Sequence, residues 1–158
     1  MTSPRGLVYY FKFGGKNKMA EFTANAVQTV LTNQNVLFTE TPVPGNCSIL
    51  HREGSGLVTL RGITKQCRAR YRVFFSGNIA IATGGTVGPI SLSIASNGET
   101  VSGTNMIVTP AAVGDYFNVA GGVFLDVPAG CCIQISIRNT STQSIDVQNA
   151  NLIVERVA

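Results

Sequence analysis

Residues 67–75 read Cys-Arg-Ala-Arg-Tyr-Arg-Val-Phe-Phe, and this stretch decides the fold class. Arginines occupy positions 68, 70 and 72, and the intervening positions carry apolar or small side chains. Successive side chains of a β-strand point to opposite faces of the sheet. The alternation therefore predicts a strand with one apolar face and one basic face, and Phe74 interrupts the basic face near the end of the stretch.

Short apolar runs separated by turn residues continue along the rest of the chain. The Asn97-Gly98 pair stands between two of them and predicts a tight hairpin, because both residues tolerate a positive φ. About ten short strands at this spacing predict an all-β fold, an antiparallel jelly-roll sandwich. The expected strands besides 67–75 are Ala26–Val30, Asn35–Thr39, Ile49–His51, Leu57–Arg61, Ile90–Ala95, Glu99–Val101, Met106–Thr109, Tyr116–Val119, Val123–Val127, Cys132–Arg138, Ile145–Gln148 and Asn151–Val157.

The positive charge of the chain is confined to its first residues. The chain has 158 residues and a formal charge of +4. Residues 1–18 contain four basic residues and no acidic one, which leaves eight basic and eight acidic residues for 19–158. We expect 1–18 to be a leader that is untranslated or disordered, and 19–158 to be a single jelly-roll domain. A neutral domain makes nucleic acid an unlikely partner.

The expected cellular compartment is inferred from the lack of a recognisable signal peptide or membrane span in this sequence. The apolar stretch 7–11 is too short for a signal peptide, and no segment approaches the length of a membrane span. We expect synthesis and folding in the cytoplasm without membrane insertion, with Cys47, Cys67, Cys131 and Cys132 as reduced thiols that pack like small apolar residues. A Cys47–Cys67 disulfide is the alternative if the protein is exported.

The sequence gives no case for an enzyme. His51 is the single histidine and lies beside a glycine-rich hairpin turn, Glu53-Gly54-Ser55-Gly56. Neighbouring Cys131 and Cys132 on a strand point to opposite faces, and Cys47 and Cys67 are twenty residues apart, so the spacing does not suit zinc. We therefore expect no catalytic residue, no metal site and no cofactor.

Two features indicate a contact surface. The arginine face has three interpretations: a solvated face, a salt-bridge row against another subunit or partner, or a site for nucleic acid or an acidic glycan. The runs Val123-Phe124-Leu125 and Leu152-Ile153-Val154 are apolar on both faces, which fits either an interface between subunits or a central strand of a monomer. The candidate interface residues are Arg68, Arg70, Arg72, Phe124, Leu152 and Val154.

Three stretches resemble the C1q/TNF-like jelly-roll superfamily, in particular the C-terminal domains of bacterial collagen-like surface proteins and related small proteins encoded by Firmicutes and their phages. They are the strand–turn–strand at 123–135, the run 88–94 followed by Asn97-Gly98, and the closing strand at 150–158. The resemblance implies a homotrimer in which one sheet of each protomer faces the threefold axis.

We therefore expect a non-enzymatic structural or assembly module. The first hypothesis is a trimeric phage or prophage virion component, a head-decoration or surface protein that contacts itself and a capsid or other virion protein. The alternative is a bacterial cell-surface or spore-coat head that binds a host receptor or a glycan.

Overall fold

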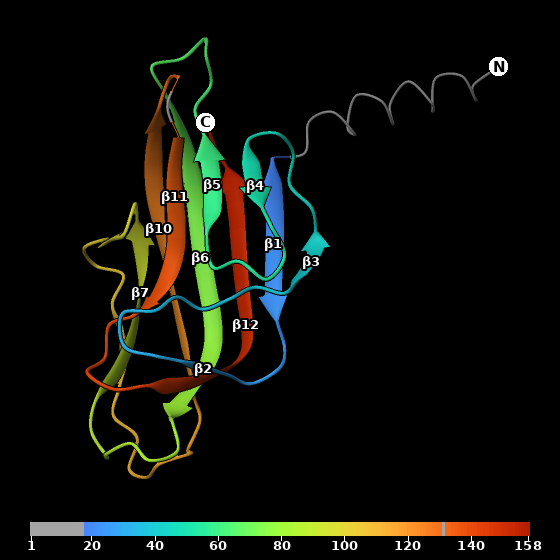
Figure 1. The fold of residues 1–158 in the computed structure, drawn as a ribbon. Helices are drawn as coiled ribbons and strands as arrows, with labels where there is room; N and C mark the ends of the chain where they lie inside the picture. Colours follow the sequence, from blue (N-terminus) through green and yellow to red (C-terminus); the bar gives the residue numbers. More distant parts are fainter. Residues whose placement is uncertain (1–17, 131) are drawn as a thin grey trace, which may run out of the picture.

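The computed structural model describes residues 18–130 and 132–158, which form two antiparallel sheets packed face to face (Figure 1). The β6 sheet contains β1 (Met19–Ala24), β2 (Gln28–Val30), β3 (Glu40–Val43), β6 (Arg68–Ile81), β10 (Phe117–Pro128) and β12 (Ile145–Arg156). The β11 sheet contains β4 (Ile49–His51), β5 (Val58–Arg61), β7 (Ile90–Ser96), β8 (Glu99–Thr100), β9 (Met106–Val108) and β11 (Cys132–Asn139).

Strands that follow one another in the sequence are divided between the two sheets. The β6 sheet runs β10-β6-β12-β1-β3, with β2 beside β12, and the β11 sheet runs β4-β5-β11-β7-β8, with β9 beside β7. Every pairing is antiparallel. The prediction of an all-β antiparallel jelly-roll sandwich is confirmed. In the described part of the chain, no helix has the length and apolar character needed to cross a membrane.

The core lies between the two sheets, and alternate side chains of β6 point into it. Ala69, Tyr71, Val73 and Phe75 are fully buried, as the alternation of residues 67–75 predicts. Phe38 packs edge-on against Phe75, with ring centroids 6.5 Å apart. Burial of such apolar surface is the main stabilising contribution to a fold of this kind.

Tyr71 also ties the two sheets together. Its hydroxyl donates a hydrogen bond to the backbone carbonyl of Arg61, at the end of β5 in the opposite sheet. Burial raises the pKa of Tyr71, so this hydroxyl stays protonated and remains a donor at neutral pH.

The hairpin between β7 and β8 turns at Asn97 and Gly98, as predicted. Their φ angles are 51° and 86°, the left-handed conformation that a two-residue hairpin of this type needs. Asn97 also docks the hairpin onto β11: its backbone N–H donates to the Gln134 carbonyl at 2.8 Å, and its Oδ1 accepts from the Gln134 N–H at 2.9 Å.

Replacing Gly98 with alanine is expected to lower the free energy of unfolding by about 1 kcal/mol, because a Cβ is strained at this φ. Nothing lies within 4 Å of the added Cβ, so a steric clash does not contribute. Chemical denaturation measures the change. The matched control is Gly88→Ala, at a position with open space and no positive φ, which should leave stability nearly unchanged. Equal stabilities for the two variants would contradict the prediction.

Residues 18–130 and 132–158 form twelve strands, and two pairs of predicted strands are merged. The expected strands on either side of Gly121-Gly122 are one strand, β10. A Cβ at Gly121 would lie 3.2 Å from the Met106 side chain, and one at Gly122 would lie 3.1 Å from the Val73 carbonyl and 3.3 Å from the Phe74 ring. These glycines therefore permit close packing within a strand and do not form a turn.

The second merged pair forms β12. Its register with β6 shifts between Gln148 and Asn151, where Asn149 has a φ of 54°, so a bulge replaces the predicted break. At the start of the domain, β1 and the Pro42-containing β3 were not predicted as strands. The expected strand Asn35–Thr39 makes a single bridge, from Asn35 to Arg138.

The two ends of the described domain are neighbours. The Lys18 carbonyl accepts a hydrogen bond of 2.7 Å from the Arg156 N–H, so the start of β1 lies beside the end of β12 (Figure 1). The leader prediction, apart from Lys18, and the predictions for Cys131 lie outside the described residues.

Candidate interaction surfaces

The outer face of the β6 sheet collects the predicted arginine row. The register places Arg72 between Phe124 of β10 and Glu155 of β12, and it places Arg70 opposite Asp126 of β10. These side chains face away from the core because the alternate residues of β6 are buried in it.

The arginines of this row are paired within the sheet. Arg70 makes a two-pronged contact with Asp126, with Nε–Oδ1 at 2.8 Å and Nη2–Oδ2 at 3.1 Å. Arg68 lies 3.7 Å from Asp126, and Arg72 lies 3.7 Å from Glu155. Such exposed pairs contribute little to stability. They do mean that this face presents alternating, partly neutralised charges rather than a free basic stripe.

The contact between Arg70 and Asp126 predicts that the Asp126 carboxylate stays ionised to a lower pH than usual. The hydrogen bond from Arg70, with the charges of Arg70 and Arg68, holds the pKa of Asp126 below its ordinary value. A lowered pKa in the folded state stabilises the fold above the unfolded-state pKa, and this contribution is lost as the pH falls through the folded-state pKa. In Arg70→Gln, the pKa of Asp126 should rise toward its ordinary value in an NMR titration of the carboxyl carbon. Arg61→Gln, on the other sheet, should leave it unchanged; an unchanged pKa in Arg70→Gln would contradict the assignment.

Apolar side chains share this outer face with the charges. Phe124 is 61% exposed, and Met19 at the start of β1 is 43% exposed. Phe74 and Ile153 are opposite each other on β6 and β12 and are half-buried. Beside them, a small cavity of about 100 Å³ is lined by Met19, Ala20, Glu21, Val43 and Ile153. The face thus carries apolar side chains beside its ion pairs.

The prediction that Leu152 and Val154 face a partner is wrong. Both are fully buried between the sheets, where they lie opposite Phe75 and Val73 of β6. Ile153 is the member of the run that faces outward. Three successive apolar residues do not indicate which of them point into the core and which point outward. Glu155 does indicate it, because it shares a face with Ile153 and its carboxylate has to reach solvent.

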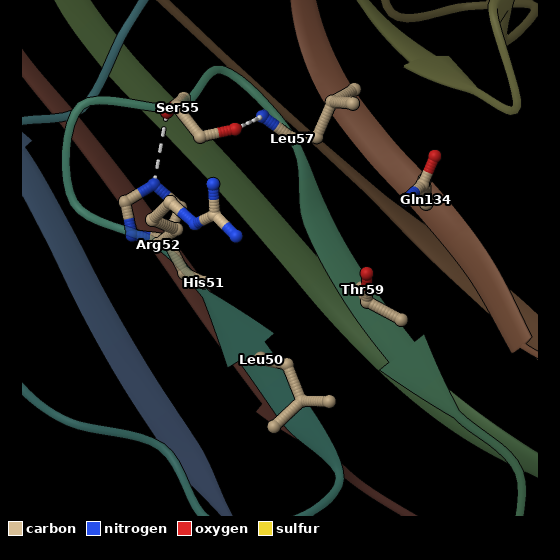
Figure 2. A pocket seen from close by; sticks show the side chains of 7 residues that line it. All are labelled: Leu50, His51, Arg52, Ser55, Leu57, Thr59 and Gln134. Carbon is tan, nitrogen blue, oxygen red and sulfur yellow. Dashed lines mark hydrogen bonds between the residues drawn. The ribbon is translucent and has the colours of Figure 1, made fainter.

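A second surface is an open groove on the outer face of the β11 sheet. It has a volume of about 420 Å³ and lies over β4, β5 and β11, beside the loop that joins β4 to β5 (Figure 2). Leu50, Thr59 and Gln134 form its floor, since they are aligned across the three strands. His51 at the end of β4 and the loop residues Arg52, Ser55 and Leu57 line its side.

His51 has the contacts of a packing residue. Its Nε2 donates to the Ser55 carbonyl at 2.9 Å, and its ring stacks at a tilt on Phe22, with centroids 4.6 Å apart. Its Nδ1 is buried and has no hydrogen-bond partner among the described residues. The ring is therefore held at the hairpin edge, and neither ring nitrogen is hydrogen-bonded to a nucleophilic side chain in the described chain.

The three described cysteines do not pack in the core. Cys47 and Cys67 are exposed with free thiols, and Cys132 is exposed at the start of β11. The expectation that they replace small apolar residues inside is wrong for these three positions. No group of three or more His, Cys, Asp or Glu side chains within 18–130 and 132–158 is arranged to hold a metal ion.

The strand order and the packing of the two sheets define a jelly-roll domain. Solved structures with the same fold are C1q- and TNF-type domains. The globular domain of zebrafish complement 1qA protein has a TM-score of 0.61 at 14% identity, over 89% of this chain and 98% of that one. Eiger TNF from S. frugiperda gives 0.64 at 12%, over 90% and 93%, and murine APRIL gives 0.60 at 9%, over 89% and 99%. The amino-acid sequence matches no family model and no curated protein.

Proposed function

We propose that this chain is a non-enzymatic assembly and binding module that forms a homotrimer through the outer face of the β6 sheet. The observation that carries the proposal is Phe124, a large aromatic side chain that is 61% exposed on the outer face of β10, the edge strand of that sheet. Aromatic residues are enriched at the centres of protein interfaces, where they supply most of the buried apolar area.

The surroundings of Phe124 suit contact with another copy of the chain. Ion pairs lie beside the exposed apolar side chains, so the face offers donors and acceptors that can re-pair across an interface without leaving a charge alone. The resemblance to C1q and TNF jelly-roll domains supports a trimer, since it implies three protomers with one sheet of each toward the threefold axis.

For the setting, we propose a phage or prophage particle, with the module as a head-decoration or surface component on a capsid or other virion protein. Support comes from the resemblance to small phage-encoded proteins and from a domain with few charges, which suits a protein that hides part of its surface in an assembly. The alternative is a bacterial cell or spore surface, with the module as a head that binds a receptor or a glycan. Proteomics of purified particles and of cell-surface fractions distinguishes the two.

Light scattering after size exclusion tests the assembly. A mass of three times the chain mass of 16.7 kDa supports the trimer. A monomer at micromolar concentration would overturn it and leave the outer face of the β6 sheet without the proposed occupant.

A further inference from the structure

The groove on the β11 sheet has a flat floor built by cross-strand neighbours. Thr59 of β5 is aligned with Leu50 of β4 on one side and with Gln134 of β11 on the other. Side chains aligned in this way stand about 5 Å apart. Figure 2 shows the three side chains in a row across the strands, with Arg52 and Leu57 beside the row. The floor therefore offers an amide, a hydroxyl and an apolar side chain in one row.

The wall of the groove is held in place before any ligand arrives. The Gly54 N–H donates to the Phe38 carbonyl at 2.8 Å, and the Phe38 N–H donates to the Ser55 carbonyl at 3.2 Å. The Leu57 N–H donates to the Ser55 hydroxyl oxygen at 3.0 Å. A Cβ at Gly56 would lie 2.9 Å from the Val36 carbonyl, so the loop sits directly against the neighbouring segment. A fixed wall lowers the entropy that binding costs.

The groove is rich in donors and holds one cation. In the described part of the chain, Arg52 pairs with no acidic side chain, unlike the arginines of the β6 sheet. The hydroxyl of Ser55 accepts from Leu57 and keeps its own proton to donate. Thr59 and Gln134 add a hydroxyl and an amide, and no carboxylate lines the groove. The chemistry calls for a ligand with a negative group and several hydroxyl or carbonyl oxygens.

We propose that this groove binds a carboxylate-bearing saccharide. The guanidinium of Arg52 takes the carboxylate, since its planar fork matches two oxygens. Thr59, Ser55 and Gln134 exchange hydrogen bonds with sugar hydroxyls, and Leu50 and Leu57 cover the apolar face of the ring. This inference deepens the binding role proposed above and does not depend on the trimer.

A saccharide fits the groove better than an acidic peptide. Peptides usually bind either by adding a strand to a free sheet edge or by inserting side chains into an apolar pocket. Here the ligand would lie on the face of the sheet, where β5 is already paired on both sides by β4 and β11. The floor is shallow and mixed in polarity, with Thr59 and Gln134 beside a single leucine. It provides dispersed hydrogen bonds and no deep pocket.

The experiment is an amide NMR titration of the full chain with the methyl glycosides of N-acetylneuraminic acid and glucuronic acid. We expect saturable shifts confined to residues 50–59 and 134, with an affinity in the millimolar range that is ordinary for a single sugar in an open site. The methyl ester of the same sugar, which lacks the negative charge, should bind at least about tenfold more weakly.

The matched variants separate a specific site from general charge attraction. Arg52→Gln should lower the affinity about tenfold or more, because a charge-assisted hydrogen bond is lost. Arg61→Gln removes the same charge from β5 on the same sheet, outside the groove, and should leave the affinity unchanged.

Several results would overturn the proposal: no shifts with either sugar, equal binding of acid and ester, equal losses in the two variants, or shifts caused by an acidic peptide and not by the sugars. The oligomeric state is read separately by light scattering. A monomer that binds the sugar contradicts the trimer alone, and a trimer that does not bind it contradicts this inference alone.

Discussion

Phe124→Asp is expected to convert the proposed trimer into a folded monomer. The side chain is 61% exposed and points away from the core, so the substitution removes no packing within the protomer. In a trimer it would bring three new carboxylates onto adjoining faces, next to Asp126, and would remove an aromatic contact of the interface. Loss of one well-buried aromatic residue of an interface costs about 2–4 kcal/mol of binding energy, about 30- to 1000-fold in affinity. Light scattering over a concentration series measures the change.

The control for Phe124→Asp is Ile107→Asp. Ile107 is 62% exposed, which matches Phe124, but it lies on β9 of the opposite sheet. This variant should stay trimeric. Circular dichroism confirms that both variants remain folded. If Phe124→Asp keeps the trimer mass, or if both variants lose it, the outer face of the β6 sheet is not the interface.

Asn139→Ala is expected to lower the free energy of unfolding by about 3 kcal/mol, because the groups it satisfies are buried. The Nδ2 of this fully buried asparagine donates to the carbonyls of Val30 and Gln143, each at 3.0 Å. Its Oδ1 accepts from the Ser141 N–H at 2.8 Å. One side chain thus joins the end of β11 to β2 and to the loop that precedes β12. Urea denaturation at equilibrium measures the loss.

Asn118→Ala is the matched control for Asn139→Ala. The Asn118 amide also makes two hydrogen bonds, to the Gly77 carbonyl at 3.3 Å and to Asn78 Oδ1 at 3.2 Å, but the side chain is exposed on β10. Water replaces those bonds, so the change should be within about 0.5 kcal/mol. Similar losses for the two variants would mean that burial of Asn139 does not determine its contribution.

The sequence predicts the fold well where charge and apolar residues alternate. In residues 67–75 the three arginines mark the outer face without ambiguity, and the structure places each of them there. The prediction fails where the same local signal has two physical causes. The pair Gly121-Gly122 indicates a break between strands, but both glycines lie within β10. They lack a side chain because Met106 and Phe74 of neighbouring strands pack against them. Such a contact depends on a partner distant in sequence, so no local pattern reveals it.

The surfaces were predictable only in part. Phe124 and the arginines lie on an exposed face, as predicted. Leu152 and Val154 are buried instead, because three successive apolar residues do not by themselves indicate which face of a strand meets the core. The groove was not predicted. Its floor joins Thr59 to Gln134 across 75 positions of sequence, and that alignment follows from the pairing of β5 with β11, which no motif announces.

The hydrogen bond between Lys18 and Arg156 fixes the direction in which the domain can be tethered. A polypeptide fused before β1 and another fused after β12 would both leave from the same end of the sandwich. The loop between β6 and β7 and the loop between β11 and β12 lie at the opposite end, where Gln143 holds the Thr86 backbone with bonds of 2.7 and 2.8 Å. A domain anchored through either end of its chain would hold the loop between β6 and β7 away from the support. A peptide inserted near residue 84 would therefore be displayed on the side opposite the anchor.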